Sequence, residues 1–331
     1  MNWIAMGAIA QIAGAAGSIA IACVAVYIGI RQWVDGKRIS REQRELTEQI
    51  ELNHNISTLE QERIIRAQSL DSYFDGISTL LLRDEDGIFT DTARSLTKGR
   101  TDAILKILKA DEKRNLVAFL YGSGLISRNG TDTVPMVSLS GSDLSLVELN
   151  GASLQQAGFG LANLRGAVIK EADLDGIDLR GADLSDADLT GSDLTQADLH
   201  GVIAFATVLS GVDLSHADLS GADLSGSDLT SANLSGVNLH GADLKNAKLE
   251  NANLSGANLR DANFTGAALQ GAQLTNLISI EGADFTGVSA LSGESAEYLA
   301  SIASGAHPET FRQTAQTLKN LSSTGTAQDR A

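Results

Sequence analysis

Five histidines and a large excess of carboxylates are the side chains of this 331-residue chain that could support acid–base or metal chemistry. The histidines are His54, His200, His216, His240 and His307. None has an evident nucleophile partner, and no glycine-rich phosphate loop occurs. The chain has one cysteine, which excludes a cysteine-rich metal site. We therefore predict no catalytic, metal-binding or cofactor-binding residue, and no cofactor.

The carboxylates are concentrated in one part of the chain. Residues 137–288 contain 16 Asp and 4 Glu against 3 Arg and 3 Lys, a net charge of −14 out of −16 for the whole chain. This acidic balance favours solubility and argues against direct nucleic-acid binding. Hydrophobic residues make up 43% of the chain, enough for a core, but aromatic residues make up only 4%. The core must therefore be built from aliphatic side chains.

A large apolar residue recurs at every fifth position from Leu139 to Leu274. These 28 centres are leucine in 24 cases. The exceptions are Phe159, Ile169, Ala204 and Phe264. The residue two before a centre is small or β-branched, the residue one before is usually Asp or Asn, and the residue two after is often Gly. One unit of five residues therefore repeats along almost half of the chain.

A period of five fits neither an α-helix nor a flat strand. On a helix the centres would spiral around every face, and on a strand each centre would flip to the opposite side. All of the centres can lie inside only if the chain turns a corner about every five residues, and glycine permits such tight corners. The pattern therefore predicts a solenoid, in which each coil buries its apolar side against its neighbours.

The repeated pattern A-(D/N)-L-x-x, as in Gly181-Ala182-Asp183-Leu184-Ser185, resembles the pentapeptide-repeat family over about 45% of the chain. The resemblance implies a mainly β fold, a right-handed quadrilateral β-helix with four pentapeptides per coil and seven coils spaced about 4.8 Å apart. It also implies that the centres fill the axis of the solenoid. The axial residues singled out are Leu184, Leu189, Leu194, Leu214, Leu224, Leu234, Leu244 and Leu254.

With four repeats per coil, residues 20 apart stack, and aspartates form two columns on adjoining faces. The acidic columns are Asp173/Asp193/Asp213 and Asp178/Asp198/Asp218. Each neighbouring pair is expected to cost just under about 1 kcal/mol in bulk water, and less with salt. Some members of the family resemble duplex DNA in width and charge and protect DNA gyrase from quinolones. The resemblance therefore implies an alternative function, a DNA-mimicking pentapeptide protein that binds DNA gyrase.

The repeat is interrupted at Gly201–Leu209. Ile203 and Val208 replace the usual aspartate, Ala204 replaces the central leucine, and Phe205 follows it. An apolar island on an acidic surface is a candidate docking site for a protein partner, formed by Ile203, Phe205 and Val208. The alternative is internal repacking, with Phe205 folded inward to fill the volume that Ala204 lacks.

Residues 3–30 carry no formal charge and are long enough to span a bilayer. Basic residues follow the run, namely Arg31, Lys37, Arg38, Arg41 and Arg44. The positive-inside rule then predicts a single-pass protein of the bacterial inner (cytoplasmic) membrane with its C-terminal bulk in the cytoplasm. Small residues at four-residue spacing in the run leave open a homo-oligomer through the transmembrane or adaptor helices.

Five segments follow from these patterns. They are a transmembrane helix at 1–30, a helical juxtamembrane adaptor at 31–133, the β-helix at 134–288, a C-terminal helical cap at 289–321 and a flexible tail at 322–331. We expect breaks at 71–76 and 83–87, helices at 101–109, 111–121, 292–304 and 308–321, and a slip of register after Leu274. The whole predicts a non-enzymatic, membrane-anchored scaffold that presents a rigid acidic surface to an unidentified protein.

Overall fold

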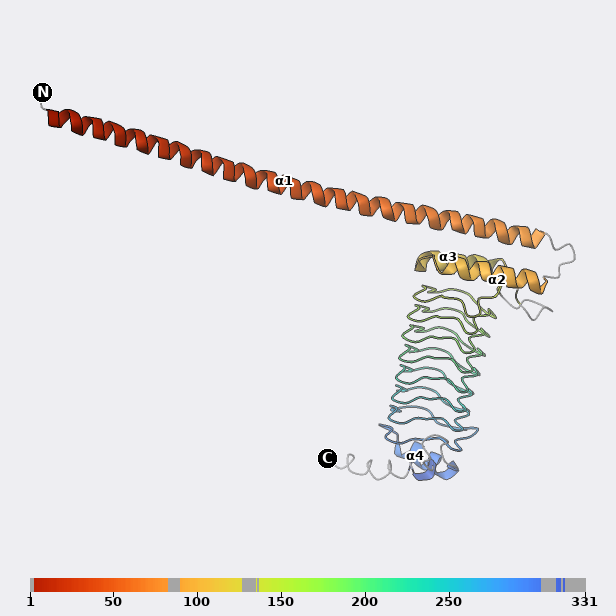
Figure 1. Cartoon of the computed structure of the whole chain (residues 1–331). Coiled ribbons are helices and arrows are strands. Elements are labelled where there is room, and N and C mark those ends of the chain that lie inside the picture. Colours follow the sequence, from red (N-terminus) through yellow and green to blue (C-terminus); the bar gives the residue numbers. More distant parts are fainter. Residues whose placement is uncertain are drawn as a thin grey trace, which may run out of the picture. The chain divides into compact units, whose positions relative to one another are not determined.

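The computed structural model describes residues 3–82, 90–126, 135, 137–304, 314–316 and 318, with the backbone alone for residues 3–30, 33–34, 36, 39–40, 42 and 80–82. The chain divides into two compact units, Met1–Gln68 and Ser69–Ala331. The first unit consists of most of α1 (Trp3–Leu82), one continuous helix. The second holds the end of α1, α2 (Asp91–Leu105), α3 (Ala110–Gly122), the stacked coils and α4 (Gly293–Ile302) (Figure 1).

The predicted transmembrane helix is not supported. No helix in the described part of the chain is both long enough and apolar enough to cross a membrane. The side chains of residues 3–30, on which the prediction depends, lie outside the described residues. The backbone of α1 continues as a helix past residue 30, into the segment predicted as a helical adaptor. The five basic residues that were expected to set the topology are exposed on α1.

The predicted break at residues 71–76 is wrong, because α1 continues to Leu82. Tyr73 and Ile77 are buried in the core of the second unit, which holds this stretch in a helix. The Tyr73 hydroxyl lies 3.0 Å from the hydroxyl of Thr101 in α2. Gly76 serves close packing rather than a turn, since a Cβ there would lie 1.6 Å from the Arg100 guanidinium. The second predicted break, at 83–87, lies outside the described residues.

The helices α2 and α3 begin at capping groups. The Thr90 hydroxyl accepts a hydrogen bond from the backbone N–H of Ala93 (3.2 Å), so α2 begins ten residues earlier than predicted. In α3 the Glu112 carboxylate accepts from the backbone N–H of the N-cap residue Lys109 (2.9 Å), two residues before the predicted start of this helix at residue 111. Leu116 and Leu120 of α3 are buried against the first coil, whereas Phe119, which was expected to be buried with them, is 47% exposed.

Stacked coils form the rest of the second unit, and each has four sides. Parallel bridges join residues 20 apart at every fifth position, from Asp143↔Asn163 to Asn253↔Gln273. Each coil bonds to the next through paired backbone groups: Leu184 N donates to Ile203 O (2.7 Å), and Ile203 N to Ala182 O (2.9 Å). The structure is therefore a β-helix of short bridged segments, a solenoid as the period of five predicts and a β-helix as the family resemblance implies.

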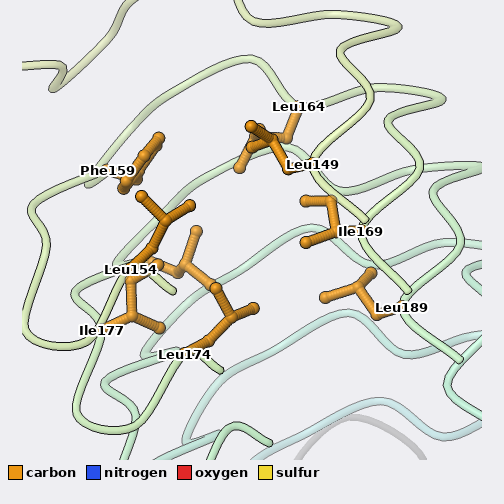
Figure 2. A pocket seen from close by; sticks show the side chains of 9 residues that line it. Leu149, Leu154, Phe159, Leu164, Ile169, Leu174, Ile177 and Leu189 are labelled. Carbon is orange, nitrogen blue, oxygen red and sulfur yellow. The ribbon is translucent and has the colours of Figure 1, made fainter. Parts of the chain in front are cut away.

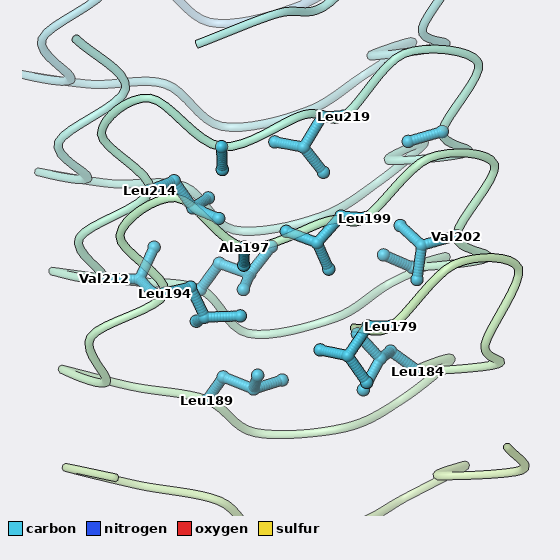
Figure 3. Close-up of a cluster of buried hydrophobic side chains, with 14 of the residues drawn as sticks. Leu179, Leu184, Leu189, Leu194, Ala197, Leu199, Val202, Val212, Leu214 and Leu219 are labelled. Atoms are coloured by element: carbon cyan, nitrogen blue, oxygen red, sulfur yellow. The ribbon is translucent and has the colours of Figure 1, made fainter. Parts of the chain in front are cut away.

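The centres of the repeats lie inside the coils, where they stack along the axis (Figure 3). All eight predicted axial leucines are at most 2% exposed. The small residues two before each centre, such as Ala182 and Ala222, are buried beside them. Near the C-terminal end, the rings of Phe264 and Phe285 stack with centroids 5.1 Å apart. The core is therefore continuous and almost entirely aliphatic.

The corners explain the rest of the repeat. The residue two after each centre has a positive φ, which is why glycine is so common there; Gly221 has a φ of +66°. The aspartate before a centre accepts a hydrogen bond from the backbone N–H two residues on, as Asp183 does from Ser185 (2.9 Å). Asparagine accepts the same bond, as Asn263 Oδ1 does from the backbone N–H of Thr265 (3.0 Å). The Asp/Asn preference thus comes from an Asx turn at the corners that carry one of these two residues.

The predicted slip after Leu274 is a single extra residue. Bridges before it join residues 20 apart, whereas Asn258↔Ser279 joins residues 21 apart. The helix α4 follows and covers the last coil, with Leu299 buried and the Tyr298 hydroxyl accepting from Leu277 N (3.1 Å). Of the second predicted cap helix, only residues 314–316 and 318 are described, and all are helical. The predicted tail at 322–331 lies outside the described residues.

Candidate functional site

The interruption of the repeat leaves the backbone of its coil intact. Ile203 bridges Asp183 on one neighbouring coil and Asp223 on the other, and Val208 bridges Asp188 and Asp228 in the same way. Ala204, at the centre, donates its N–H to Asp223 O (2.7 Å), as any other centre does. The change is therefore confined to side chains, and it places three apolar ones at an outer corner of the coil.

Phe205 points out of the solenoid. Its side chain is 51% exposed and that of Ile203 is 44% exposed, while Val208 is half-buried and Ala204 is buried. Phe205 thus does not fill the volume left by Ala204, and the repacking alternative is wrong. We call Ile203, Phe205 and Val208 the apolar edge. They occupy one corner and the two sides that meet there.

The carboxylates on the two sides of the apolar edge differ in their partners. Beside Val208, Asp188 pairs with the Lys170 ammonium (2.6 Å) and Asp228 with that of Lys248 (3.4 Å). Beside Ile203, Asp183 and Asp223 accept hydrogen bonds through Oδ1 only. No cation of the described part of the chain pairs with either of these two. The Ile203 side therefore presents two carboxylates without cations, with an apolar side chain between them.

The ion pairs with lysine on the Val208 side lower the pKa of the two aspartates there, Asp188 and Asp228. Burial alone would raise the pKa of Asp188, but hydrogen bonds from Lys170 and Thr190 outweigh it, so the pKa lies below its ordinary value. The pKa of Asp228 is lowered in the same way, with burial opposed by Thr230 and Lys248. Both groups are therefore ionised and already matched by a positive charge at neutral pH.

The two acidic columns stack as predicted, but parts of them are neutralised. Asp173, Asp193 and Asp213 bridge one another in turn, and so do the members of the second column. In the second column, Arg180 binds Asp178 (2.7 Å) and reaches Asp198 (3.3 Å). Both columns continue as asparagines: Asn233 donates to Asp213 (3.1 Å), and Asn238 donates to Asp218 (2.9 Å). The strongest acidic surface thus covers only the N-terminal half of these two faces.

The histidines are spread along the chain. His200 contacts Ser220 Oγ (2.9 Å), and His240 contacts the Arg260 carbonyl oxygen (3.1 Å), both at exposed corners. His216 packs its ring over Gly236, and His54 is exposed on α1. His307 lies outside the described residues. Within the described residues, no group of three or more His, Cys, Asp or Glu side chains could hold a metal ion.

The interior of the solenoid has almost no free space. The space among its axial side chains near the N-terminal end measures about 10 Å³ and is lined by aliphatic residues and Phe159 (Figure 2). That is about the room of one water molecule and has no polar partner for it. A wider groove of about 360 Å³ lies between the end of α1 and α3, where Phe74 and Phe119 meet edge to face. Neither space brings titratable side chains together.

Sequence reasoning missed the pairing of Lys170 and Lys248 with the aspartates beside Val208. For Lys248 a signal was present, because it stands 20 residues after Asp228, at the next position of the same column. For Lys170 the signal is weaker, because it reaches Asp188 on the adjacent coil diagonally, from a position two residues after the column partner Val168. The difference between the two sides of the apolar edge therefore becomes visible only in the structure.

The sequence model of the family Pentapeptide repeats matches residues 162–201, 207–246 and 242–276, in eight copies. The first two stretches stop on either side of residues 202–206, which include Ile203 and Phe205. The family pattern therefore holds over most of the coils, and Ile203 and Phe205 of the apolar edge lie in the gap between two matches, while Val208 lies within the second. A comparison with curated proteins found no match.

Solved structures of pentapeptide repeat proteins are similar to part of the chain. HetL, involved in heterocyst differentiation regulation in the cyanobacterium Nostoc, is 28% identical over 55% of this chain and 96% of its own, with a TM-score of 0.22. QnrB1, a plasmid-mediated fluoroquinolone resistance protein, is 26% identical over 50% and 82%, with a TM-score of 0.35. A protein of the Arabidopsis thaliana thylakoid lumen is 30% identical over 55% and 88%, with a TM-score of 0.17.

Proposed function

We propose that this chain, which belongs to the pentapeptide-repeat family, is a non-enzymatic protein-interaction module that holds a partner protein at the apolar edge. The observation that carries the proposal is Phe205, an aromatic residue that is 51% exposed beside polar residues of the neighbouring coils such as Asp186 and Ser225. Aromatic side chains surrounded by polar ones are the usual anchors of protein interfaces. The interaction requires only the stacked coils, so it does not depend on membrane attachment.

The scaffold suits this role because it is rigid around the anchor. The backbone on both sides of Phe205 is bonded to the neighbouring coils: Asp186 N donates to Phe205 O (3.1 Å), and Ala206 N to Ser225 O (3.1 Å). Thr207 is buried, and its hydroxyl donates to Leu184 O (2.8 Å). A partner that docks at Phe205 therefore loses little free energy to ordering of this surface.

A photo-crosslinking amino acid at position 205 tests the proposal in the cell that makes the protein. We expect a covalent adduct with one protein, and we expect Ile203→Asp in the same chain to abolish it. Position 161 is the matched control, because Leu161 is also an apolar corner residue and is 69% exposed. The same adduct at both positions, or an adduct that survives Ile203→Asp, would contradict docking at the apolar edge.

A second candidate function is mimicry of DNA in a complex with gyrase, which the acidic columns favour. A supercoiling assay with purified gyrase separates the two. Under the second candidate, the chain protects or inhibits gyrase, and Asp193→Asn with Asp213→Asn removes the effect while Phe205→Ser does not. Under the first, gyrase activity does not change with any of these chains, and only the apolar edge affects partner binding.

A further inference from the structure

We infer that the partner segment docked at the apolar edge is an α-helix that places two basic side chains, seven residues apart, over Asp183 and Asp223 and an apolar side chain between them over Ile203. The inference rests on the proposed function and adds to it the chemistry and conformation of the partner. It is carried by the column Asp183–Ile203–Asp223 and by the different pairing of the carboxylates beside Val208.

The spacing of this column fits a helix better than a strand. Its three members bridge one another in parallel, so they lie on successive coils about 4.8 Å apart and the two carboxylates are about 9.6 Å apart. Along one face of an α-helix, residues i, i+3 and i+7 stand at about 0, 4.5 and 10.5 Å. Side chains on one face of a strand stand at about 0, 6.7 and 13.4 Å. Only a helix therefore places one side chain over each of Asp183, Ile203 and Asp223.

The charges decide where the basic residues of the partner lie. Asp183 and Asp223 each hold Oδ1 in an Asx turn, and the described part of the chain supplies no cation to either. Asp188 and Asp228 already bind Lys170 and Lys248. A partner cation gains a new ion pair on the Ile203 side, whereas on the Val208 side it would have to displace a lysine. The partner's basic face therefore lies over Ile203.

The apolar contact comes from the corner. Ile203 and Phe205 are both about half exposed and lie two residues apart, on one side of the coil and at its edge. A side chain such as Leu at position i+3 or i+4 of the partner helix reaches both of them. The expected partner segment therefore reads basic–x–x–apolar–apolar–x–x–basic on one helical face, with the helix lying along the axis of the coils.

The test uses the full chain and two synthetic, alanine-rich helical peptides of the same composition. The matched peptide has Lys at i and i+7 and Leu at i+3 and i+4. In the control peptide the two lysines are moved two positions along the helix, so that they leave the face of the leucines. We expect fluorescence anisotropy to show the matched peptide binding at least about tenfold more tightly, because the anchor and both ion pairs are then made together.

Charge-removing variants of the protein locate the peptide. Asp183→Asn together with Asp223→Asn is expected to weaken the matched peptide about fivefold. These changes retain the Asx turns, because Asn163 and Asn263 make the same turn in the same column. The paired change Asp188→Asn and Asp228→Asn is the matched control and should weaken binding less than about twofold. Added salt should weaken binding to the wild type and not to the first variant.

Three results would overturn the inference: equal binding of the two peptides, equal effects of the two aspartate pairs, or binding that Phe205→Asp leaves unchanged. The photo-crosslink at position 205 separates this failure from failure of the proposed function. A specific adduct with a partner that is not helical at the contact would keep the docking role and remove the helix. Loss of both the adduct and peptide discrimination would remove both.

Discussion

Single residues of the repeat have roles that their chemistry explains. The aspartate before each centre accepts the N–H of the corner, and this bond favours its charged form. In Asp213, burial alone would raise the pKa, but hydrogen bonds from Ser215 and Asn233 hold it below its ordinary value. Asp218 is lowered likewise, with burial opposed by Ser220 and Asn238. The acidic surface is therefore a consequence of the turn chemistry as well as a charged face.

Acidification should destabilise the coils. A carboxylate whose folded pKa lies below its unfolded value, which is about 3.9 for aspartate, contributes stability that is complete above that value. The contribution is lost as the pH falls through the folded pKa. We expect the free energy of unfolding, from urea titrations, to change little between pH 7 and 5 and to drop below about pH 4. Asp213→Asn should make this drop smaller, and an unchanged drop would contradict the assignment.

Corner side chains cover glycines on the next coil, and this contact can be measured. A Cβ at Gly236 would lie 2.6 Å from the His216 ring, whereas a Cβ at Gly226 would meet nothing within 4 Å. Both glycines have positive φ, +66° and +68°. Gly226→Ala should lower the free energy of unfolding by about 1 kcal/mol through backbone strain alone. Gly236→Ala should lower it by roughly 1 kcal/mol more, because the new methyl group also meets the His216 ring. In a His216→Ala chain the two costs should become equal; a persistent difference would mean that the ring is not the cause.

At the scale of elements, the coils could be predicted from the sequence, whereas the bounds of the helices could be predicted only in part. A period of five has one solution that buries every centre, so the axial leucines and the slip after Leu274 could be predicted. The stacked columns could be predicted only with the four repeats per coil that the family resemblance implies. The helices have no comparable repeat. Gly76 was interpreted as a turn because its partner, Arg100, is 24 residues away. The exposure of Phe205 could not be predicted either, because the sequence alone does not show whether an aromatic residue beside an alanine points into the core of the coils or into solvent.

The acidic column Asp173/Asp193/Asp213 is an element whose repulsion can be relieved without harming the turns. Asp193 bridges an aspartate on each side and caps Thr195 N (2.9 Å). Asp193→Asn keeps that cap and removes two repulsions, so it should stabilise the coils by about 0.5–1.5 kcal/mol at low salt. The gain should fade at high salt. Asp228→Asn is the control, since it removes the pair with Lys248 and should not stabilise; equal gains in both variants would contradict the column.

The second unit is capped at both ends, and a stack of coils requires such caps to remain monomeric. At the N-terminal end, Val137 N donates to Leu125 O (2.8 Å) and Gly158 N to Ile126 O (3.3 Å), in the chain that follows α3. At the C-terminal end, Gly282 N donates to Ser304 O (2.9 Å), just after α4. The last coil would otherwise present unpaired backbone groups and apolar centres to a second molecule.

Opening the C-terminal end should therefore change the assembly state before it unfolds the coils. Leu299 of α4 is fully buried against the last coil, so Leu299→Asp should detach the cap, while the bridges from Asp143 to Gln273 remain. Light scattering after size exclusion should show association that grows with protein concentration, with the circular dichroism of the coils retained. Tyr298→Phe removes only the hydrogen bond to Leu277 N and should not associate. A Leu299→Asp chain that keeps the mass of the wild type and melts at the same temperature would show that α4 does not cap the coils.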